Sequence, residues 1–246
     1  VSLETSARPD GAGGWVLNGA KKWIGNGAAG GITIVWARDT EDGQVKGFVV
    51  EQSTPGYEAE VITGKGALRA IHQAEITLTD VRVGDDARLP GVARFKDAAR
   101  VLVATRVNVG WSALGHATAM FEAALAYARQ REQFGKPIAK FQGMQFQMAQ
   151  IATEIEAARL MVYNAARRKE AGLPFTKEAA MAKLFSSQVA QRAAGSAIEW
   201  AGGQGFTREQ GIEKYWRDSK IGAIYEGTSN IQLNTIFNLT AKEKGF

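Results

Sequence analysis

The segment IYEGTSNIQ carries a single carboxylate, Glu226, in a setting that suits acid–base chemistry. Gly227 permits a tight turn after it, and Ser229 and Gln232 have the spacing of a capping box, which predicts that a helix begins here. The unpaired N–H groups of a helix N-terminus favour an anion, whereas Tyr225 and the neighbouring isoleucines would exclude water and disfavour the charge. Opposed influences of this kind can make a carboxylate a general base. The alternative is a plain acid that complements the helix dipole.

A glycine-rich segment, AGGQGFTREQ, contains Gly202 and Gly203. It follows a predicted helix and not a strand, so it is not a Rossmann phosphate loop. Thr207 and Gln210 form a second possible capping box, which predicts a short helix. The segment is either a turn between helices or a backbone surface that a pyrophosphate or a flavin edge can approach.

Basic residues gather in RQREQFGKPIAKFQ, where one predicted helix ends and the next begins. Basic side chains such as Arg131 interact favourably with the dipole at a helix C-terminus in any protein, and they would also suit a phosphate. Phe134 and Phe141 are candidates for the core. In KKWIGNG, Trp23 is either a core residue, which the pattern alone favours, or a surface on which a planar cofactor stacks.

The composition excludes several classes of site. The chain has 246 residues, a formal net charge of +5 and no cysteine, so it has neither a disulfide framework nor a thiolate metal site. His72 and His116 show no metal-ligand or triad spacing, and we expect no metal site. No apolar run reaches about 18 residues, so we expect no membrane span. Basic and aromatic residues do not alternate as single-strand recognition requires, so we expect no nucleic-acid partner.

The first part of the chain, residues 1–90, has the patterns of β structure. Asn18-Gly19 and Asp42-Gly43 each lie between short apolar runs and predict two hairpins. Alternating polar and apolar residues around Glu75 to Thr79 predict a strand with one wet and one buried face. We expect a small antiparallel β sandwich or barrel, incomplete at its N-terminal edge because the chain begins in mid-strand without a methionine.

The second part, residues 91–246, has helical periodicity. Met144, Met148, Ile151, Ile155, Ala158 and Val162 recur at steps of three and four, and similar stripes cover 95–130 and 178–200. Gly172 and Pro174 separate two helices, and Thr176 is placed to cap the second. The predicted fold class is therefore α+β, with a small β domain followed by an antiparallel four-helix bundle.

Several of these stretches occur together in one known family. KKWIGNG, REQFGKPIAKFQ, GGQGFTRE, RDSKI and IYEGTSNIQ resemble, in order and spacing, the acyl-CoA dehydrogenase family. The resemblance covers essentially the whole chain, as the middle β domain from partway in plus the C-terminal helical domain, with the family's N-terminal helical domain absent. GDDARLPGVARFKDAARVLVATRVNVGW further resembles the branch of glutaryl-CoA dehydrogenases and short-chain acyl-CoA oxidases.

The resemblance implies FAD as cofactor and an acyl-CoA thioester as substrate. No amino-acid side chain accepts a hydride, so desaturation of an alkyl chain needs a cofactor. Glu226 matches the base that removes the α-proton, while a hydride from the β-carbon goes to flavin N5. The backbone N–H of Glu226, with a flavin ribityl hydroxyl, would hold the thioester oxygen.

The resemblance also assigns roles to binding residues. Trp23 and Ile24 match positions that pack on the flavin, and Thr228 and Asn230 match positions near the FAD of their own subunit. Residues that reach the FAD of a neighbouring subunit are matched by Arg131, Gln133, Phe134, Gln142, Gly202 and Gly203. Tyr225 would border the acyl pocket, and Arg106 matches an arginine on the CoA path. Gly25, Val103 and Glu199 depart from the residues usual at their positions.

We therefore expect an oxidoreductase of fatty acid metabolism that desaturates acyl-CoA and passes electrons to an electron-transfer flavoprotein. Since one FAD would draw on two chains, a homodimer or homotetramer is implied. The alternatives are an acyl-CoA oxidase that uses oxygen and a truncated, non-catalytic homologue, since the fragment alone lacks a domain that completes the site in the family. The expected compartment is the cytoplasm in a bacterium and the mitochondrion or peroxisome in a eukaryote. The sequence does not indicate the acyl chain length.

Overall fold

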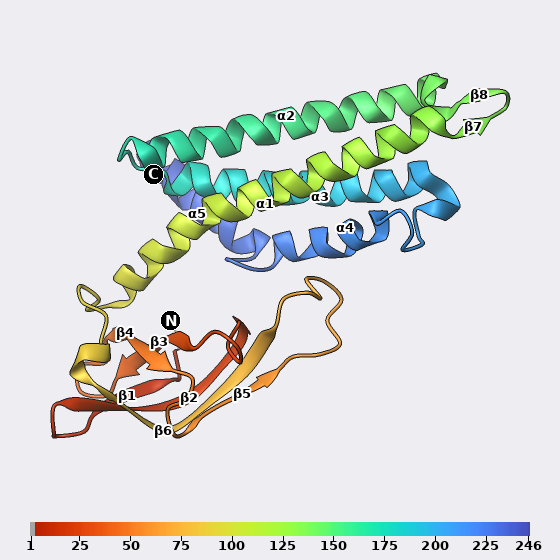
Figure 1. The fold of residues 1–246 in the computed structure, drawn as a ribbon. Coiled ribbons are helices and arrows are strands. Elements are labelled where there is room, and N and C mark those ends of the chain that lie inside the picture. The colour runs from red at the N-terminus through yellow and green to blue at the C-terminus, as the bar shows by residue number, and fades with distance from the viewer. Residues whose placement is uncertain (1–2) are drawn as a thin grey trace. The chain divides into compact units, whose positions relative to one another are not determined.

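The computed structural model describes residues 3–246 and divides into two compact units, Val1–Val101 and Leu102–Phe246. The first unit is built on a six-stranded sheet of order β4-β3-β1-β2-β6-β5 (Figure 1). Its strands are β1 (Ser6–Pro9), β2 (Gly14–Gly25), β3 (Ile32–Asp39), β4 (Val45–Glu51), β5 (Tyr57–Val61) and β6 (Gln73–Gly84). Neighbouring strands are antiparallel except β1 and β3, which are parallel.

Local patterns in this sheet agree with two of the predictions. The segment that contains Asp42-Gly43 joins β3 to the antiparallel β4, so the second predicted hairpin is confirmed. Along β6, Ala74, Ile76 and Leu78 are buried, while Glu75 and Thr77 are exposed, so the expected wet and buried faces are confirmed. The buried face packs against apolar residues of the other strands to form the core of this unit.

The predicted hairpin at Asn18-Gly19 is wrong, because β2 runs without interruption from Gly14 to Gly25. The pair lies at an irregularity in the pairing of β2 with β6. The Asn18 amide donates to Asp80 Oδ1 at 3.0 Å and accepts from the Asp80 backbone N–H at 2.9 Å. Gly19 has φ +139°, and a Cβ there would lie 2.8 Å from the Cα of Thr5. The same residue pair that suits a turn therefore serves a bulge and a close backbone approach.

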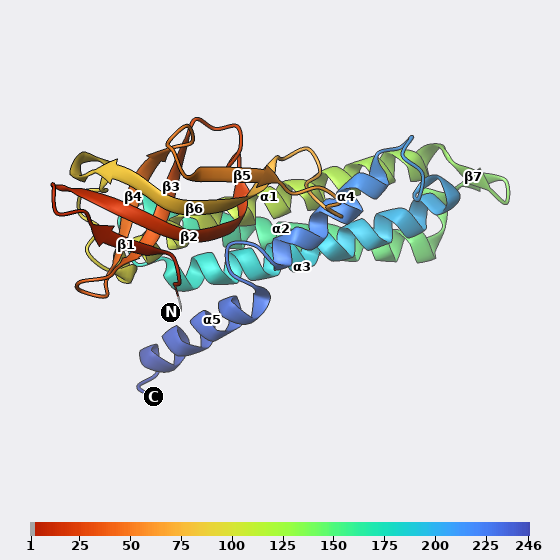
Figure 2. The same cartoon turned by 90° about the horizontal axis from the view of Figure 1, so that it is seen from below.

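Helices make up most of the second unit. They are α1 (Phe95–Gln130), α2 (Gln142–Glu170), α3 (Thr176–Ala201), α4 (Ile212–Ser219) and α5 (Ser229–Glu243). Residues 95–101 of α1 belong to the first unit. A small β7–β8 hairpin (Glu132–Gln133 and Lys136–Pro137) joins α1 to α2. α4 packs along α3 (Figure 2), and α5 packs on α3 as well. The predicted α+β class, a β domain followed by a helical domain, is confirmed.

The helical core contains the predicted stripe of α2. Met148, Ile151, Ile155, Ala158 and Val162 are all buried, and Met144 is half-buried. On α3 the buried positions are largely alanine. Small side chains on a buried face let helix backbones approach closely, so this unit is held together by dense packing of small residues as well as by large ones.

All three predicted helix caps are wrong in their contacts. Thr176 is the first residue of α3, and Phe175 at the N-cap position makes no side-chain cap bond. The Thr207 hydroxyl donates to the Gln204 carbonyl, and α4 begins only at Ile212. α5 does begin at Ser229, as predicted, but no cap bond forms, because the amide of Gln232 turns back to the preceding loop.

Between residues 3 and 246, no helix combines the length and the apolar character that a bilayer span requires.

Candidate functional site

Glu226 lies in the short loop between the 3-10 turn Lys220–Ala223 and α5. Its backbone is left-handed, with φ +52°, and Gly227 follows with φ +90°. A left-handed conformation is uncommon for residues other than glycine and is retained where the surroundings hold it in place. The backbone N–H of Glu226 makes no hydrogen bond within residues 3–246. The turn therefore presents both a carboxylate and a free backbone donor.

The carboxylate of Glu226 is half-buried and meets α1. The Thr105 hydroxyl lies 2.7 Å from Glu226 Oε2 and 3.1 Å from the Leu102 carbonyl oxygen. A hydroxyl has one proton to donate and lone pairs to accept. It can donate to the ionised carboxylate, or accept from a protonated Glu226 and donate to Leu102. The Thr105 hydroxyl thus suits both protonation states of this acid.

Two cations lie beside this carboxylate. The pKa of the Lys183 ammonium is lowered to about 8, chiefly by burial and next by repulsion from Arg106, while attraction to Glu226 opposes both. Burial also lowers the pKa of Arg106, again opposed by Glu226, and Arg106 Nε is buried without a hydrogen-bond partner among the described residues. Two cations and one carboxylate leave the cluster with an excess positive charge that suits a further anionic or strongly polarised oxygen.

Tyr225 shares this environment. Burial raises the pKa of its phenol, a hydrogen bond with Ser112 lowers it, and the Glu226 carboxylate raises it. Tyr225 is half-buried, and its phenol interacts electrostatically with the Glu226 carboxylate. The Glu226 carboxylate therefore lies among a half-buried aromatic residue, Tyr225, and two cations, Lys183 and Arg106.

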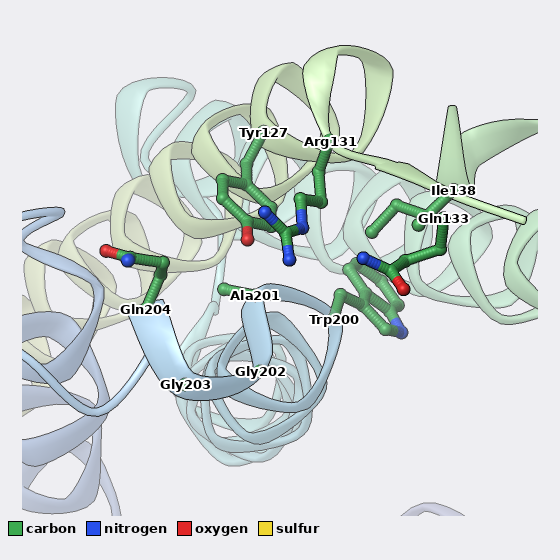
Figure 3. Close-up of a pocket in the computed structure, with 9 residues that line it drawn as sticks. All are labelled: Tyr127, Arg131, Gln133, Ile138, Trp200, Ala201, Gly202, Gly203 and Gln204. Atoms are coloured by element: carbon green, nitrogen blue, oxygen red, sulfur yellow. The ribbon is translucent and has the colours of Figure 1, made fainter. Parts of the chain in front are cut away.

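A hollow lies at the far end of α1 from this cluster. It has a volume of about 350 Å³ and is lined by Tyr127, Arg131, Gln133, Ile138, Trp200, Ala201, Gly202, Gly203 and Gln204. Figure 3 shows the Arg131 side chain reaching from the α1 end toward the Gly202–Gly203 turn, with Gln133 beside the Trp200 indole. The structure therefore brings together four of the residues named from the sequence.

The glycines of this turn differ in what surrounds the position of a Cβ atom. A Cβ on Gly205 would lie 2.5 Å from the Ile198 carbonyl oxygen, so that glycine permits close backbone packing. Gly202 and Gly203 have nothing within 4 Å of their Cβ positions, so they open onto the hollow. The Arg131 guanidinium makes no hydrogen bond or ion pair with another described side chain. An unpaired guanidinium over exposed backbone is a suitable place for an anionic or hydrogen-bonding group.

The β7–β8 hairpin carries an exposed aromatic residue. Phe134 is 92% exposed at the tip of the hairpin, so its interpretation as a core residue is wrong. Its backbone and that of Gly135 are both left-handed, at φ +51° and +75°, as a tight two-residue turn requires. Phe134 stands edge-on to Phe141 at 6.3 Å, and Gln142 is exposed at the start of α2. These residues are available to a partner surface.

In the β unit, Trp23 is 62% exposed, so the core interpretation that its pattern favoured is also wrong. Its φ is +67°, at an irregularity in the pairing of β2 and β6 between Lys21 and Ile24. The bulge turns the indole out of the alternation of the strand, and Ile24 is half-buried beside it. An exposed indole is a platform on which a planar group can stack.

Of the remaining predicted residues, Thr228 and Asn230 are exposed at the start of α5. Sequence reasoning missed Thr105 and Lys183, and it assigned Gln232 to a helix cap and not to the turn that carries Glu226. A signal existed for Lys183, because it falls on the apolar face of α3 among buried alanines and serines. Lysine is rarely buried in such a position unless its charge has a partner. No local signal marked Thr105, which looks like any polar helix residue. Within residues 3–246, no group of three or more histidine, aspartate or glutamate side chains is arranged to hold a metal ion.

Comparison with known proteins gives the following similarities. Residues 1–81 match the family model "Acyl-CoA dehydrogenase, middle domain", and residues 95–238 match "Acyl-CoA dehydrogenase, C-terminal domain". A Dictyostelium discoideum protein named "Probable short/branched chain specific acyl-CoA dehydrogenase" is 46% identical over 96% of this chain and 58% of its own length. A rat protein named "Short/branched chain specific acyl-CoA dehydrogenase, mitochondrial" is 41% identical over 96% of this chain and 56% of its own length.

A solved structure agrees with these matches. A glutaryl-CoA dehydrogenase from Mycobacterium smegmatis, in complex with FADH2, superposes with a TM-score of 0.94 at 31% identity, over 100% of this chain and 63% of that one. The chain thus spans less than two thirds of the length of these relatives.

Proposed function

Because the chain belongs to the acyl-CoA dehydrogenase family, we propose that the protein containing it desaturates an acyl-CoA thioester between its α and β carbons, with FAD as cofactor. The observation that carries the proposal is the cluster around Glu226. A half-buried carboxylate, a left-handed turn with a free N–H, a buried lysine and a half-buried arginine are gathered at one point, which a surface acid would not need.

Glu226 is the base in this proposal. It takes the α-proton of the thioester as an ionised carboxylate and holds it as a carboxylic acid. The Thr105 hydroxyl serves the first state as donor and the second as acceptor, so the contact survives the proton transfer. A positioned general base contributes typically about 10²–10⁴-fold to a proton abstraction.

The free backbone N–H of Glu226 is suited to the thioester oxygen. Removal of an α-proton moves negative charge onto that oxygen, and a preorganised donor stabilises the charge. The excess positive charge of Lys183 and Arg106 acts in the same direction. Arg106, which the resemblance places on the CoA path, combines this effect with an unpaired buried Nε.

The residues present fit FAD at two places. The hollow at Arg131, Gly202 and Gly203 has open backbone and an unpaired guanidinium, which suit the polar part of a dinucleotide. In the β unit, the exposed Trp23 indole with Ile24 suits a flat ring. When bound, the flavin accepts the hydride that leaves the β-carbon. The chain's own part is to hold the cofactor, orient the thioester and move the α-proton to Glu226.

The oligomeric state, the electron acceptor and the cellular compartment are proposed from the resemblance to the family. Arg131, Gln133 and Phe134 would reach the FAD of a neighbouring subunit, and their exposure leaves them available for it. The proposed assembly is therefore a homodimer, or a homotetramer of two such dimers, with an electron-transfer flavoprotein as acceptor. The compartment is the mitochondrion in a eukaryote and the cytoplasm in a bacterium. The names of the relatives at 46% and 41% identity favour a short or branched acyl chain.

The test uses the full-length protein with an artificial electron acceptor and a panel of short, branched and long acyl-CoAs. Glu226→Gln should lose turnover by roughly 10²-fold or more, with FAD still bound. Glu170→Gln, at the exposed end of α2, is the matched control and should behave as wild type. Wild-type turnover in Glu226→Gln would remove the base assignment. Hydrogen peroxide formed at the full rate without an added acceptor would identify an oxidase instead.

A further inference from the structure

Lys183 is a charged residue in the core of the helical unit. It is 0% exposed on α3, and its neighbours on the buried face are alanines and serines. It makes no ion pair with any described carboxylate within 4.0 Å. Its ammonium donates one hydrogen bond, of 2.7 Å, to the carbonyl of Gly227. Burial of a charge is costly unless the charge is paired, so a lysine kept here with a single carbonyl partner points to a specific task.

The carbonyl that Lys183 holds belongs to the turn that carries Glu226. Gln232, also 0% exposed, donates to the same Gly227 carbonyl at 2.9 Å and to the Glu226 carbonyl at 3.2 Å. Two buried donors, from α3 and α5, therefore converge on two consecutive carbonyls. The backbone of Glu226 is left-handed, a conformation that a residue other than glycine retains when its surroundings hold it, whereas Gly227 adopts positive φ without strain.

We propose that Lys183 is a positioning residue for the reaction: its ammonium fixes the Glu226–Gly227 turn, so that the carboxylate faces Thr105 and the Glu226 N–H stays free for the thioester oxygen. The inference rests on the proposed function, since it takes Glu226 as the base. Gln232 is the uncharged second half of the same clamp.

Lys183 also contributes charge. The charged groups that face it are Arg106 on α1 and Glu226 in the loop, with the Tyr225 phenol close to the same carboxylate. A buried cation near the base favours its ionised form. Removal of the ammonium should therefore change two separable properties, the geometry of the turn and the pH at which the base becomes active.

The test compares three variants in the full-length protein. Lys183→Met removes the donor and the charge and keeps a linear side chain. Lys183→Arg keeps the charge with a different reach. Gln232→Leu removes the other donor to Gly227 without a change of charge. Ile155→Val, in the α2 core, controls for a simple loss of packing, because it leaves a small cavity away from the loop.

In Lys183→Met, kcat should fall on the order of tenfold or more, and the acid limb of the kcat/KM profile should move upward by roughly one pH unit. Lys183→Arg should return the acid limb to the wild-type position. Gln232→Leu should lower kcat without moving that limb. A crystal structure of Lys183→Met should show Glu226 outside the left-handed region or its carboxylate turned from Thr105. Ile155→Val should lower the melting temperature and leave kcat and the pH profile unchanged.

Wild-type kcat and pH profile in Lys183→Met would overturn the proposal, as would a variant whose only change is a lower melting temperature like that of Ile155→Val. If Lys183→Met does not fold, Lys183→Arg and Gln232→Leu decide: wild-type kinetics in both would equally overturn it. The Glu226→Gln variant distinguishes failure of the positioning role from failure of the proposed function. If Glu226→Gln is inactive while the Lys183 variants behave as wild type, only the positioning role fails; if Glu226→Gln keeps full turnover, the proposed function fails.

Discussion

Thr105 and Glu226 are 121 residues apart in the sequence, and their side-chain oxygens lie 2.7 Å apart in the structure. The same hydroxyl lies 3.1 Å from the Leu102 carbonyl oxygen. It can therefore donate to the ionised acid, or accept from the protonated acid while donating to Leu102. A base that must hold a proton after taking it benefits from a partner that does not have to move.

Two replacements of Thr105 distinguish the effect of its hydroxyl from the effect of its side-chain shape. A hydrogen bond to a charged group contributes roughly 1.5–3 kcal/mol, so Thr105→Val should lower kcat by about tenfold or more. The acid limb of the kcat/KM profile should move to higher pH, because the carboxylate loses a donor. Thr105→Ser should restore both properties. Identical pH profiles for wild type and Thr105→Val would contradict this role.

The hollow beside Gly202 and Gly203 can be filled without disturbing the fold. A Cβ on Gly203 meets nothing within 4 Å, so Gly203→Val should fold normally and extend into the space lined by Arg131. FAD affinity should fall by roughly tenfold, which corresponds to about 1.4 kcal/mol. Fluorescence titration of the apoprotein with FAD measures it. Gly143→Val, at another open glycine near the start of α2, is the control and should keep wild-type affinity.

Two glycines of β2 should respond differently to alanine. Gly19 has φ +139°, and its Cβ would lie 2.8 Å from the backbone Cα of Thr5, so Gly19→Ala should destabilise the protein by roughly 1–3 kcal/mol. Gly25→Ala has open space and no positive φ, and should change stability by less than about 0.5 kcal/mol. Urea denaturation followed by tryptophan fluorescence compares them. Equal losses would show that the bulge at Gly19 is not strained by a side chain.

Lys183 should make stability depend on alkaline pH. Its folded-state pKa is lowered from 10.5 to about 8, chiefly by burial. Between those two values the unfolded chain binds the proton more tightly than the folded one, so the free energy of unfolding rises with pH across this window. Relative to Lys183→Met, the wild type should gain on the order of 1–3 kcal/mol from pH 8 to pH 10.5. A difference between the two proteins that does not change with pH would contradict the lowered pKa.

Local patterns were sufficient for most of the secondary structure. The stripe from Met144 to Val162 predicted α2 and its buried face, and alternation predicted the two faces of β6. The resemblance in short motifs predicted the family, which the comparisons confirm. The roles assigned to individual site residues and the domain boundary between residues 90 and 91 stay predictions.

The errors have a common physical origin. Asn18-Gly19 suits a hairpin turn, and it also suits a bulge, because both need an unusual backbone and a short polar side chain. Likewise, the Gln232 amide has the spacing of a cap, but two carbonyls in the preceding loop compete for it. Trp23 follows a core-like strand pattern until a bulge turns it outward. In each case, a short motif is compatible with more than one structure, and contacts outside the motif select among them.

The sequence by itself determined the periodicities, the order of the two structural classes and the carboxylate at the start of α5, because these depend on near neighbours along the chain. Only the tertiary structure decided which groups surround that carboxylate. Thr105, Lys183 and Gln232 come from three different helices, and their meeting depends on how α1, α3 and α5 pack, to which every buried side chain between them contributes.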